Sequence, residues 1–421
     1  MKNEENQKSS GFGVFDLAPA LQRGVAAAGF TRPRPIQAAA LPAALAGRDV
    51  LGLAQTGTGK TAAFALPILQ RLVEAPAPGP RSLIVAPTRE LAAQISTEIR
   101  ALGRFTRIRV ATVFGGVSAH KQRRELGAQP EIVVACPGRL LDLMGQGVVS
   151  LDRIECLVLD EADHMFDMGF LPDVRRVLRA LPERRQNLLF SATMPPEIRA
   201  LADRVLSNPH VVDLAHARPL ETIEHALYPV ENTAKLALLR RILNDGDDGF
   251  VSAIVFTRTK HRARRIARQL ERAGHRAIAL QGNMPQNQRV RAMDGFRQRR
   301  YDVLVATDIA ARGIDVQQVS HVVNFDMPNT TDAYTHRIGR TGRADRQGKA
   351  YTFVTAEDHR LVSQVEKRLG LPIPRRRVDG IESIPFPQSH PASAARGPSS
   401  RARKRPPARP RRRRRSRPAA R

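Results

Sequence analysis

Residues 49–74, DVLGLAQTGTGKTAAFALPILQRLVE, decide the fold that this chain can adopt. The stretch opens with an apolar run that predicts a buried strand and then turns through a segment rich in Gly and Thr. It continues with apolar residues at helical spacing. An apolar strand that passes through a short turn into an amphipathic helix is typical of a parallel sheet covered by helices. The stretch therefore predicts an α/β domain.

The same pattern recurs along most of the chain. Further predicted strands cover residues 82–87, 108–116, 131–137, 156–163 and 187–193, with helical segments between them. After a pause at 217–230, predicted strands follow at 252–259, 276–282, 301–308, 321–328 and 348–354. We therefore expect two α/β domains of similar size, each a mostly parallel sheet with helices on both faces.

Composition indicates where these domains begin and end. The last part of the chain is rich in Pro, Ser, Ala and Arg, so it cannot bury a core and we expect it to be disordered. The predicted organisation is a flexible N-terminus at 1–11, a first domain at 12–213, a linker at 214–222, a second domain at 223–377 and a disordered, Arg-rich basic tail at 378–421.

The net charge of +28 indicates a polyanionic partner. Residues 389–421 contain 13 Lys or Arg and no acidic residue, and the remaining chain still carries +15. The chain has 59 Arg and 9 Lys, and the Arg fork can bind two phosphate oxygens at once. Genomic codon bias is an equally good explanation of the preference for Arg, but it does not explain the net charge.

The chain offers little that points to a membrane or to secretion. No apolar run approaches the roughly 18 residues of a membrane helix, and the N-terminus lacks the apolar core of a signal peptide. The two cysteines, Cys136 and Cys156, make neither a disulfide framework nor a four-ligand metal site. We expect a cytoplasmic protein.

The Gly-rich turn AQTGTGKT, residues 54–61, has the context that a phosphate-binding loop requires. Glycines allow backbone N–H groups to turn toward phosphate oxygens, and the following helix adds its N-terminal dipole. The predicted nucleotide-binding residues are Thr56, Gly57, Thr58, Gly59, Lys60 and Thr61, with Lys60 on the β- and γ-phosphates and Thr61 on Mg²⁺. Ala54 departs from the strict G-x4-G-K-[ST] pattern, and an ordinary glycine-rich turn is the alternative interpretation.

Three carboxylates follow the predicted strand in LVLDEADHMFD, residues 157–167. In a doubly wound sheet, ligands bind at the carboxyl ends of the strands, so we expect Asp160 to hold Mg²⁺ directly or through water. Glu161 is expected to orient or deprotonate the attacking water, and Asp163 to make a contact between motifs. The alternative is an acidic first turn of a helix. Four scattered histidines, His164 among them, show no metal-ligand spacing and are given no functional role.

Residues 160–163 spell Asp-Glu-Ala-Asp, and residues 12–370 resemble the DEAD-box ATP-dependent RNA helicases, closest to the bacterial RhlE-like group. The resemblance implies two tandem RecA-like domains, ATP and Mg²⁺ as cofactors, and RNA as partner. The Q motif is matched by Phe12 and by GFTRPRPIQ, residues 29–37, which implies adenine contacts from Gln37 and stacking by Phe12. Arg34 stands where the family usually has Thr.

Other family motifs imply further roles. SAT, residues 191–193, implies interdomain coupling through Ser191 and Thr193 together with Asp163. HRIGRTGR, residues 336–343, implies catalytic arginine fingers at Arg340 and Arg343 and interdomain contacts by His336 and Arg337. Asp315 is implied as a ribose contact. The implied RNA-binding residues are Arg89, Gly115, Gly116, Arg139, Gly282, Arg289 and Thr307, with Cys136 in place of the usual Thr.

The predicted function is RNA-stimulated ATP hydrolysis coupled to local separation of short duplexes or remodelling of RNA–protein complexes. Two other functions stay open at this point: a DNA translocase of the same architecture, and a non-hydrolysing protein that anneals RNA through its basic tail. The tail is either a solvated end or a tether for structured RNA. We expect a monomer, with ribosomal particles or the RNA-decay machinery as further partners, and the roles in ribosome assembly, mRNA decay and cold adaptation are left open.

Overall fold

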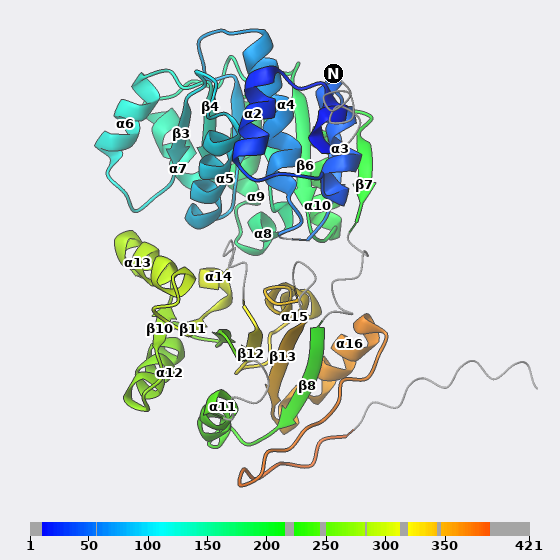
Figure 1. Ribbon diagram of the computed structural model, residues 1–421, viewed down its shortest axis with the longest axis vertical. Helices are drawn as coiled ribbons and strands as arrows, with labels where there is room; N and C mark the ends of the chain where they lie inside the picture. The colour runs from blue at the N-terminus through cyan, green and yellow to red at the C-terminus, as the bar shows by residue number, and fades with distance from the viewer. Residues whose placement is uncertain are drawn as a thin grey trace, which may run out of the picture.

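Two α/β domains lie one above the other in the computed structural model (Figure 1). The structure describes residues 11–55, 57–214, 223–244, 250–282, 284–311, 319–342 and 347–387. The predicted site residues Thr56, Asp315 and Arg343, the terminal segments 1–10 and 388–421, and residues 215–222 of the expected linker lie outside these ranges. Each domain contains one parallel sheet, so the predicted fold class is confirmed.

The first domain is built on a seven-stranded sheet with the order β3-β4-β2-β5-β6-β1-β7. Its strands are β1 (Val50–Leu53), β2 (Ser82–Val85), β3 (Val110–Val113), β4 (Ile132–Ala135), β5 (Cys156–Leu159), β6 (Gln186–Ser191) and β7 (His210–Asp213). Neighbouring strands pair in parallel throughout, with Val50 opposite Leu188 on one side and His210 on the other. The carboxyl ends of the strands therefore meet at one edge, which carries the candidate site.

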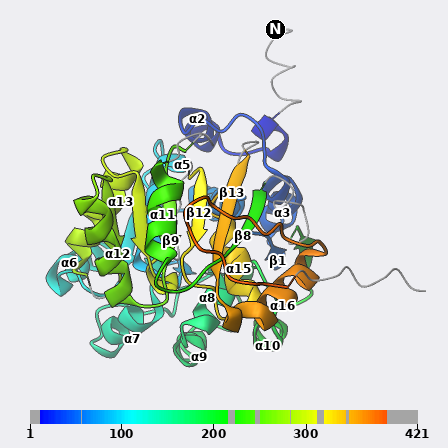
Figure 2. The same ribbon diagram turned by 90° about the horizontal axis from the view of Figure 1, so that it is seen from below.

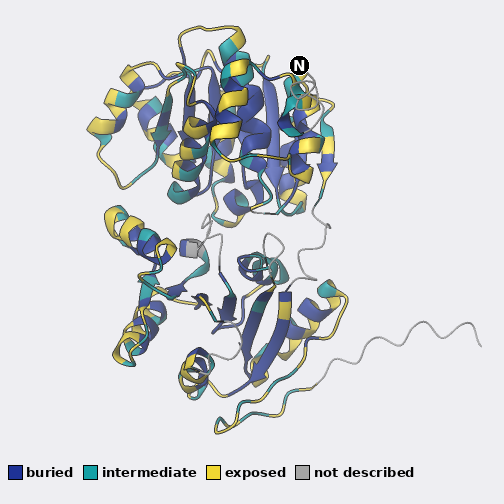
Figure 3. Ribbon diagram, in the orientation of Figure 1, coloured by how far each residue is buried: buried dark blue, intermediate teal, exposed yellow. Residues whose placement is uncertain are grey.

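Helices cover both faces of this sheet (Figures 1 and 2). They are the 3-10 helix η1 (Gly11–Phe15) and the α-helices α2 (Pro19–Ala27), α3 (Pro35–Leu45), α4 (Lys60–Glu74), α5 (Arg89–Leu102), α6 (Ala119–Gly127), α7 (Pro137–Gly145), α8 (Ala162–Asp167), α9 (Leu171–Arg179) and α10 (Pro196–Val205). Consecutive strand residues pack into different cores, because side chains alternate between the two faces of a sheet. Figure 3 shows the result, with buried strands and exposed outer helix faces.

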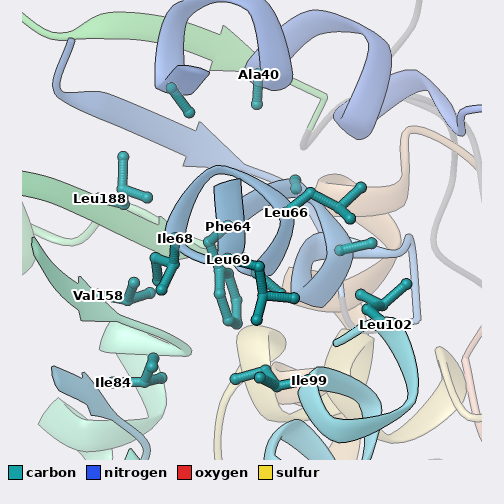
Figure 4. Close-up of a cluster of buried hydrophobic side chains, with 14 of the residues drawn as sticks. Ala40, Phe64, Leu66, Ile68, Leu69, Ile84, Ile99, Leu102, Val158 and Leu188 are labelled. Atoms are coloured by element: carbon teal, nitrogen blue, oxygen red, sulfur yellow. The ribbon is translucent and has the colours of Figure 1, made fainter. Parts of the chain in front are cut away.

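The helix that follows the Gly-rich turn is held firmly against the sheet. Phe64 and Ile68 of α4 are buried in one core with Ile84, Val158 and Leu188 from β2, β5 and β6 (Figure 4). Truncation of such a buried aromatic ring generally costs about 3–5 kcal/mol. This packing fixes the N-terminus of α4, and with it the Gly-rich turn.

The second domain is built on a six-stranded parallel sheet with the order β10-β11-β9-β12-β13-β8. Its strands are β8 (Ile223–Pro229), β9 (Ala253–Phe256), β10 (Ala277–Leu280), β11 (Val303–Ala306), β12 (His321–Asn324) and β13 (Gly348–Val354). Its helices are α11 (Lys235–Asn244), α12 (Lys260–Arg272), α13 (Gln286–Arg297), α14 (Asp308–Ala311), α15 (Thr331–Ile338), the 3-10 helix η2 (Ala356–Asp358) and α16 (His359–Leu369). Figure 2 shows α12 and α13 near one end of this sheet and α16 near the other.

The structure contains two edge strands that the sequence pattern did not predict. β7 closes one edge of the first sheet, and β8 forms where the pattern was interpreted as a pause between domains. β8 pairs along its whole length with β13, from Ile223 opposite Gly348 to Pro229 opposite Val354. The second domain therefore begins with a strand.

The expected boundary of the disordered tail at residue 378 is wrong, because the described chain continues to residue 387 and packs on the second domain. Val378 and Ile381 pack against one core of that domain, and Phe386 packs against another. Ser383 forms a β-bridge with Val230. The apolar side chains of Val378, Ile381 and Phe386 are thus partly buried against the second domain, whereas the surrounding Pro and Ser residues offer little apolar surface.

No helix among the described residues is long and apolar enough to cross a membrane.

Candidate nucleotide and nucleic-acid site

The Gly-rich turn curls at the carboxyl end of β1. Gly57 and Gly59 have φ values of 83° and 93°, in the left-handed region that glycine adopts readily. Gly59 is the N-cap of α4, so the first N–H groups of this helix face the turn. Thr58 Oγ1 donates a hydrogen bond to the Gln55 carbonyl at 2.8 Å. The turn thus has the curved backbone and the helix N-terminus that bind phosphate.

Lys60 and Asp160 bring opposite charges together at this edge of the sheet. Lys60 is 6% exposed, and its Nζ donates a hydrogen bond to the Ala54 carbonyl at 3.0 Å. Its Nζ also lies 4.0 Å from Oδ1 of Asp160, which directly follows β5. Burial raises the pKa of Asp160 to about 6, although the charge of Lys60 opposes this shift. The charge of Lys60 alone therefore does not offset the effect of burial on the Asp160 carboxylate.

Asp160 and Thr61 carry oxygen atoms of the kind that Mg²⁺ prefers. Mg²⁺ prefers hard oxygen ligands, and it commonly takes one or two from the protein and the rest from phosphates and water. A buried carboxylate with one Lys at 4.0 Å has the need for a cation, and Thr61 follows Lys60 in the first turn of α4. Among the described residues no group of three or more His, Cys, Asp or Glu could hold a metal ion. Asp160 and Thr61 offer one or two oxygen ligands, the number that Mg²⁺ commonly takes from a protein, and binding of the ion stays a prediction.

Glu161 occupies a constrained backbone position next to Asp160. Its φ is 52°, rare for a residue other than glycine, and it is the N-cap of α8. Burial opposes its ionisation, but the charge and hydrogen bond of His164 and the charges of Lys60 and Arg340 lower the pKa of Glu161 below its ordinary value. Glu161 is thus ionised at neutral pH, as a group that accepts a proton must be.

Gln37 lies against the Gly-rich turn. It is fully buried, and its Nε2 donates a hydrogen bond to the Gly59 carbonyl at 2.9 Å. Its Oε1 accepts from the Arg34 backbone N–H at 2.8 Å, and Arg34 Nη1 donates to the Gly57 carbonyl at 2.8 Å. Arg34, which departs from the family pattern, therefore contacts the same turn. A side-chain amide can make further bonds, so an adenine contact by Gln37 stays a prediction.

Phe12 packs into the protein. Its side chain is 7% exposed and makes edge-to-face contacts with Phe15 and Phe30, each at 5.9 Å between ring centroids. Base stacking by Phe12 stays a prediction, and in this structure the ring supports the segment that precedes Gln37.

Asp163 joins α8 to Ser191 and Thr193 at the end of β6, and the interdomain coupling expected of these residues stays a prediction. Its backbone N–H donates to Ser191 Oγ at 3.2 Å. Its Oδ2 accepts from the Thr193 backbone N–H at 2.9 Å and from Thr193 Oγ1 at 3.0 Å. Burial works against ionisation, but His164, His336 and Lys60 lower the pKa of Asp163. The two predicted motifs therefore form one hydrogen-bonded unit.

His164, which shows no metal-ligand spacing in the sequence, lies inside the site. It is 1% exposed, and its Nδ1 lies 2.8 Å from Glu161 Oε2. Its Nε2 lies 3.4 Å from Nδ1 of His336 in the second domain, and the two rings meet edge to face at 4.7 Å. The spacing of three residues from Glu161 could have suggested the contact, because residues i and i+3 are neighbours on a helix.

His336 lies close to the first domain, whereas Arg337 makes its contacts inside the second domain. His336 Nε2 lies 3.7 Å from Asp163 Oδ2. Arg337 is 3% exposed and pairs inside its own domain with Asp308, donates to the Asp326 carbonyl, and lies over the Phe256 ring. Consecutive helical residues point about 100° apart, so His336 faces the first domain while Arg337 faces the sheet of the second. The interdomain role expected for Arg337 is wrong.

The second domain also brings positive charge to the site. Arg340 lies two residues after the end of α15 and is 5% exposed, and its charge helps to lower the pKa of Glu161. Nearby, the Cβ position at Gly339 lies 3.8 Å from Gln55 Oε1 of the Gly-rich turn. The C-terminal end of α15 therefore approaches both the turn and the acids. The other expected arginine finger, Arg343, and the expected ribose contact, Asp315, lie outside the described residues.

A groove of about 500 Å³ lies between the domains and gathers most of the residues expected to bind RNA. Five predicted residues line it: Arg89, Gly115, Arg139, Gly282 and Arg289. The other lining residues include Cys136, which precedes α7, together with Thr88, Glu90 and Phe170. Thr307 follows β11 directly and is not among the described residues that line the groove.

The first-domain cations of the groove are held by specific contacts. Arg139 Nε donates to Gln122 Oε1 at 3.0 Å, and Arg139 forms an ion pair with Asp142. Arg89 packs over Gly116, where an added Cβ would collide with Arg89 Nη1. The absence of a side chain at Gly116 therefore lets the Arg89 guanidinium lie close to the backbone, a role that the sequence pattern did not indicate.

The domains are bridged across this groove. Arg289 of α13 is 6% exposed, and its Nε donates to Glu90 Oε1 at 2.8 Å. Gln286 of α13 lies 3.4 Å from both Arg89 and Glu90. Arg289 was predicted to bind RNA, and the structure gives it a second contact, an ion pair to the first domain. Its RNA contact stays a prediction.

The class of protein follows from this geometry: two RecA-like domains with a phosphate-binding loop on one and basic residues of the other facing it. Two family models match the chain, DEAD/DEAH box helicase over residues 34–201 and helicase conserved C-terminal domain over residues 234–345. The chain is 41% identical over 377 residues to the ATP-dependent RNA helicase RhlB of Pseudomonas syringae pv. tomato, covering 87% of this chain and 94% of that protein. It is 41% identical over 357 residues to the DEAD-box ATP-dependent RNA helicase CshA of Bacillus licheniformis. The match covers 85% of this chain and 73% of CshA.

The chain belongs to the DEAD-box ATP-dependent RNA helicases, which confirms the predicted family and enzyme class. These comparisons do not distinguish the RhlE-like group, which stays a prediction.

A solved structure resembles the domain arrangement as well as the fold. S. cerevisiae Dbp5 bound to RNA and ADP BeF3 matches with a TM-score of 0.79 at 34% identity, covering 87% of this chain and 95% of that one. A point variant of Dbp5 bound to nup159, a gle1 variant, ip6 and ADP matches with a TM-score of 0.60 at 33% identity, covering 86% and 96%. The two Dbp5 chains share one fold and differ in TM-score. This difference indicates that the domains of the present protein are arranged more nearly as in the RNA-bound Dbp5 chain.

Proposed function

We propose that this protein hydrolyses ATP in an RNA-stimulated manner and uses domain closure to separate short RNA duplexes or to remodel RNA–protein complexes. The observation that carries the proposal is that Glu161, Asp160 and Lys60 lie buried at the carboxyl edge of the first sheet, where residues of the second domain approach them. The charge of Arg340 acts on Glu161, and His336 lies 3.7 Å from the neighbouring Asp163. A site completed by two domains is active only when both are in place, so whatever holds the domains together also controls hydrolysis.

In this proposal the phosphates of ATP bind the Gly-rich turn, where Lys60 contacts the β- and γ-phosphates. The adenine lies beside Gln37. A bound Mg²⁺, held by Thr61 and Asp160, would neutralise charge on the β- and γ-phosphate oxygens. Glu161 orients a water molecule toward the γ-phosphorus and takes its proton as the new P–O bond forms and the bond to ADP breaks. Arg340, together with Arg343, stabilises the charge of the transferring phosphoryl group.

The RNA strand binds along the groove between the domains. Arg89 and Arg139 offer guanidinium groups to phosphates, and Gly115 and Gly282 allow the sugar–phosphate backbone to approach closely. Such contacts do not distinguish bases, so binding is largely independent of sequence. RNA that occupies the groove contacts both domains and so favours the closed arrangement that hydrolysis needs. Local strand separation follows from the grip on one strand.

The finer partners belong to the same proposal. The 13 Lys or Arg of residues 389–421 tether structured RNA to the catalytic domains, with an affinity that falls steeply as salt rises. Ribosomal particles and the RNA-decay machinery are partners of suitable chemistry for such a tether. We propose that the protein acts in the cytoplasm as a monomer.

The experiment that tests the proposal measures ATP hydrolysis without nucleic acid, with single-stranded RNA and with single-stranded DNA of matched sequence. We expect strong stimulation by RNA alone. The variant Glu161→Gln should keep ATP and RNA binding and lose hydrolysis by a factor of about 100 or more, since a general base contributes about 10²–10⁴. Equal stimulation by DNA would favour a translocase, and RNA binding without hydrolysis would favour an annealing protein.

A further inference from the structure

The side chain of His164 is a buried ionisable group that contacts both the expected base and the second domain. Its Nδ1 lies 2.8 Å from Glu161 Oε2 and its Nε2 lies 3.4 Å from His336 Nδ1. Only 1% of its surface is exposed, so its ring is enclosed by the surrounding residues. A residue bonded on both sides transmits the position of one partner to the other.

We propose that His164 is a positioning residue that holds the Glu161 carboxylate for attack by water and links that orientation to domain closure through His336. This inference rests on the proposed function, because it assigns a task at the same hydrolytic site. It adds a residue to which neither the family motif nor the sequence analysis gave a role.

The hydrogen-bond directions support the first half of the proposal. An ionised carboxylate only accepts hydrogen bonds, so the 2.8 Å contact requires His164 Nδ1 to donate to Glu161 Oε2. Glu161 begins α8 with a φ of 52°, and its backbone N–H is bonded to Asp160 Oδ1 at 2.9 Å. Its backbone is thus fixed by the turn, and the donated bond from His164 fixes the carboxylate group at the end of the side chain.

The second half of the proposal rests on the contact between the histidines. Their rings meet edge to face at 4.7 Å, and His336 also has Asp163 as a polar neighbour, at 3.7 Å. Burial and the charge of His164 lower the pKa of His336 to about 4, so His336 is neutral at neutral pH and its Nδ1 is able to accept. Besides His164, the charges of Asp163, Arg340 and Glu161 act on the His336 ring. When the domains separate, His336 leaves, and His164 loses the contact that fixes its ring.

Two substitutions divide these tasks. The amide nitrogen of Asn lies where Nδ1 of His lies, whereas that of Gln reaches the position of Nε2. His164→Asn therefore keeps a donor for Glu161 and loses the contact to His336, His164→Gln does the reverse, and His164→Leu removes both. His321→Asn is a matched control. His321 is also buried, at 3% exposure, but it lies at the amino end of β12, away from the candidate site, and bonds to Ser320.

The experiment measures kcat and KM for ATP, the RNA concentration for half-maximal hydrolysis, and the thermal unfolding midpoint of each full-length variant. We expect His164→Leu and His164→Gln to lower kcat roughly tenfold or more with KM for ATP nearly unchanged, because a misplaced base slows chemistry without weakening binding. His164→Asn should keep kcat within about threefold of the wild type and require more RNA. His321→Asn should change only the thermal midpoint.

Two results would overturn the inference. One is wild-type kcat in all three His164 variants, and the other is an equal fall in kcat for Asn, Gln and Leu that follows the loss of thermal stability. Both are distinguishable from failure of the proposed function, which appears as a wild-type protein that RNA does not stimulate or as an active Glu161→Gln variant. If His164→Leu does not fold, the difference in kcat between His164→Asn and His164→Gln still tests the proposal.

Discussion

Single residues of this protein have roles that depend on their immediate surroundings, and Gly116 is an example. Its φ is 79°, and an added Cβ would collide with Arg89 Nη1 and lie 2.8 Å from Arg89 Cζ. Gly116 thus gives both a left-handed backbone and the room in which Arg89 lies. The family resemblance implied that Gly116 contacts RNA through its backbone, and the structure adds that it positions a cation of the groove.

We predict that Gly116→Ala displaces Arg89 and weakens RNA binding. The RNA concentration for half-maximal ATP hydrolysis should rise roughly tenfold, as expected for the loss of one charged hydrogen bond. Hydrolysis at saturating RNA should change little, because the nucleotide site is untouched. Gly127→Ala is the matched control, since its added Cβ meets nothing within 4 Å. An unchanged RNA requirement in Gly116→Ala would mean that Arg89 does not contribute to RNA binding.

At the scale of elements, a charged pair joins the amino ends of β2 and β5, two neighbouring strands of the first sheet. Arg81 precedes β2 and is 6% exposed, and its Nε and Nη2 each donate to the Glu155 carboxylate at 2.8 Å. Glu155 precedes β5, the strand that carries Asp160 and Glu161 at its other end. The pair therefore stabilises the register of two neighbouring strands on the side opposite the candidate site.

We predict that Glu155→Gln lowers the free energy of unfolding by about 1–3 kcal/mol, the range for a charged hydrogen bond. Glu155 is 46% exposed, so solvent screening favours the lower end of that range. The hydrogen bond from Arg81 lowers the pKa of Glu155. A lowered folded-state pKa gives stability that is present above the unfolded pKa and lost as pH falls.

Denaturant titration at pH 7 and at about pH 3.5 tests this prediction. The difference between wild type and Glu155→Gln should be full at pH 7 and should shrink at the lower pH, because Glu155 then begins to be protonated. ATP hydrolysis at 25 °C should be unchanged. A difference in stability that is independent of pH would show that the pair acts through packing alone.

At the scale of the whole molecule, the two domains meet along two lines, one at the nucleotide site and one at the RNA groove. His164 and His336 meet at the first, and Glu90 and Arg289 meet at the second. Glu90 lies in the first turn of α5 in the first domain and Arg289 lies in α13 of the second, so this ion pair joins the two sides of the groove. The higher TM-score to RNA-bound Dbp5 agrees with this closed arrangement.

We predict that Glu90→Gln shifts the protein toward an open arrangement of its domains. Its side chain is 14% exposed and that of Arg289 is 7% exposed, so the pair is little screened by solvent and its loss should matter. Energy transfer between dyes on the two domains should fall in the absence of RNA, and more RNA should be needed for hydrolysis. Glu125→Gln, which breaks an exposed pair with Lys121, is the control. Equal energy transfer in both variants would contradict the prediction.

The sequence alone predicted a large part of this protein, because the relevant signals are local. The strand, turn and helix of residues 49–74 are contiguous, and so are the acids at residues 160–163, so each motif could be recognised without knowledge of the fold. Alternation of apolar strands with helices likewise predicted two parallel sheets, which the structure confirms. The edge strands β7 and β8 were missed, because their sequences, HVVD and IEHALYP, contain charged or polar residues and lack the continuous apolar run of a central strand.

Tertiary structure alone decided how distant residues share the site. Arg337 turns into its own sheet and His336 out of it, because helix phase separates neighbours in the sequence. His164 becomes part of the site only because α15 lies against α8, and Arg289 finds Glu90 only because the domains close. Val378 and Ile381 are ordered because a core of the second domain lies beside them. The sequence therefore determined which chemistry the chain carries, and the packing of separate elements determined which side chains carry it out together.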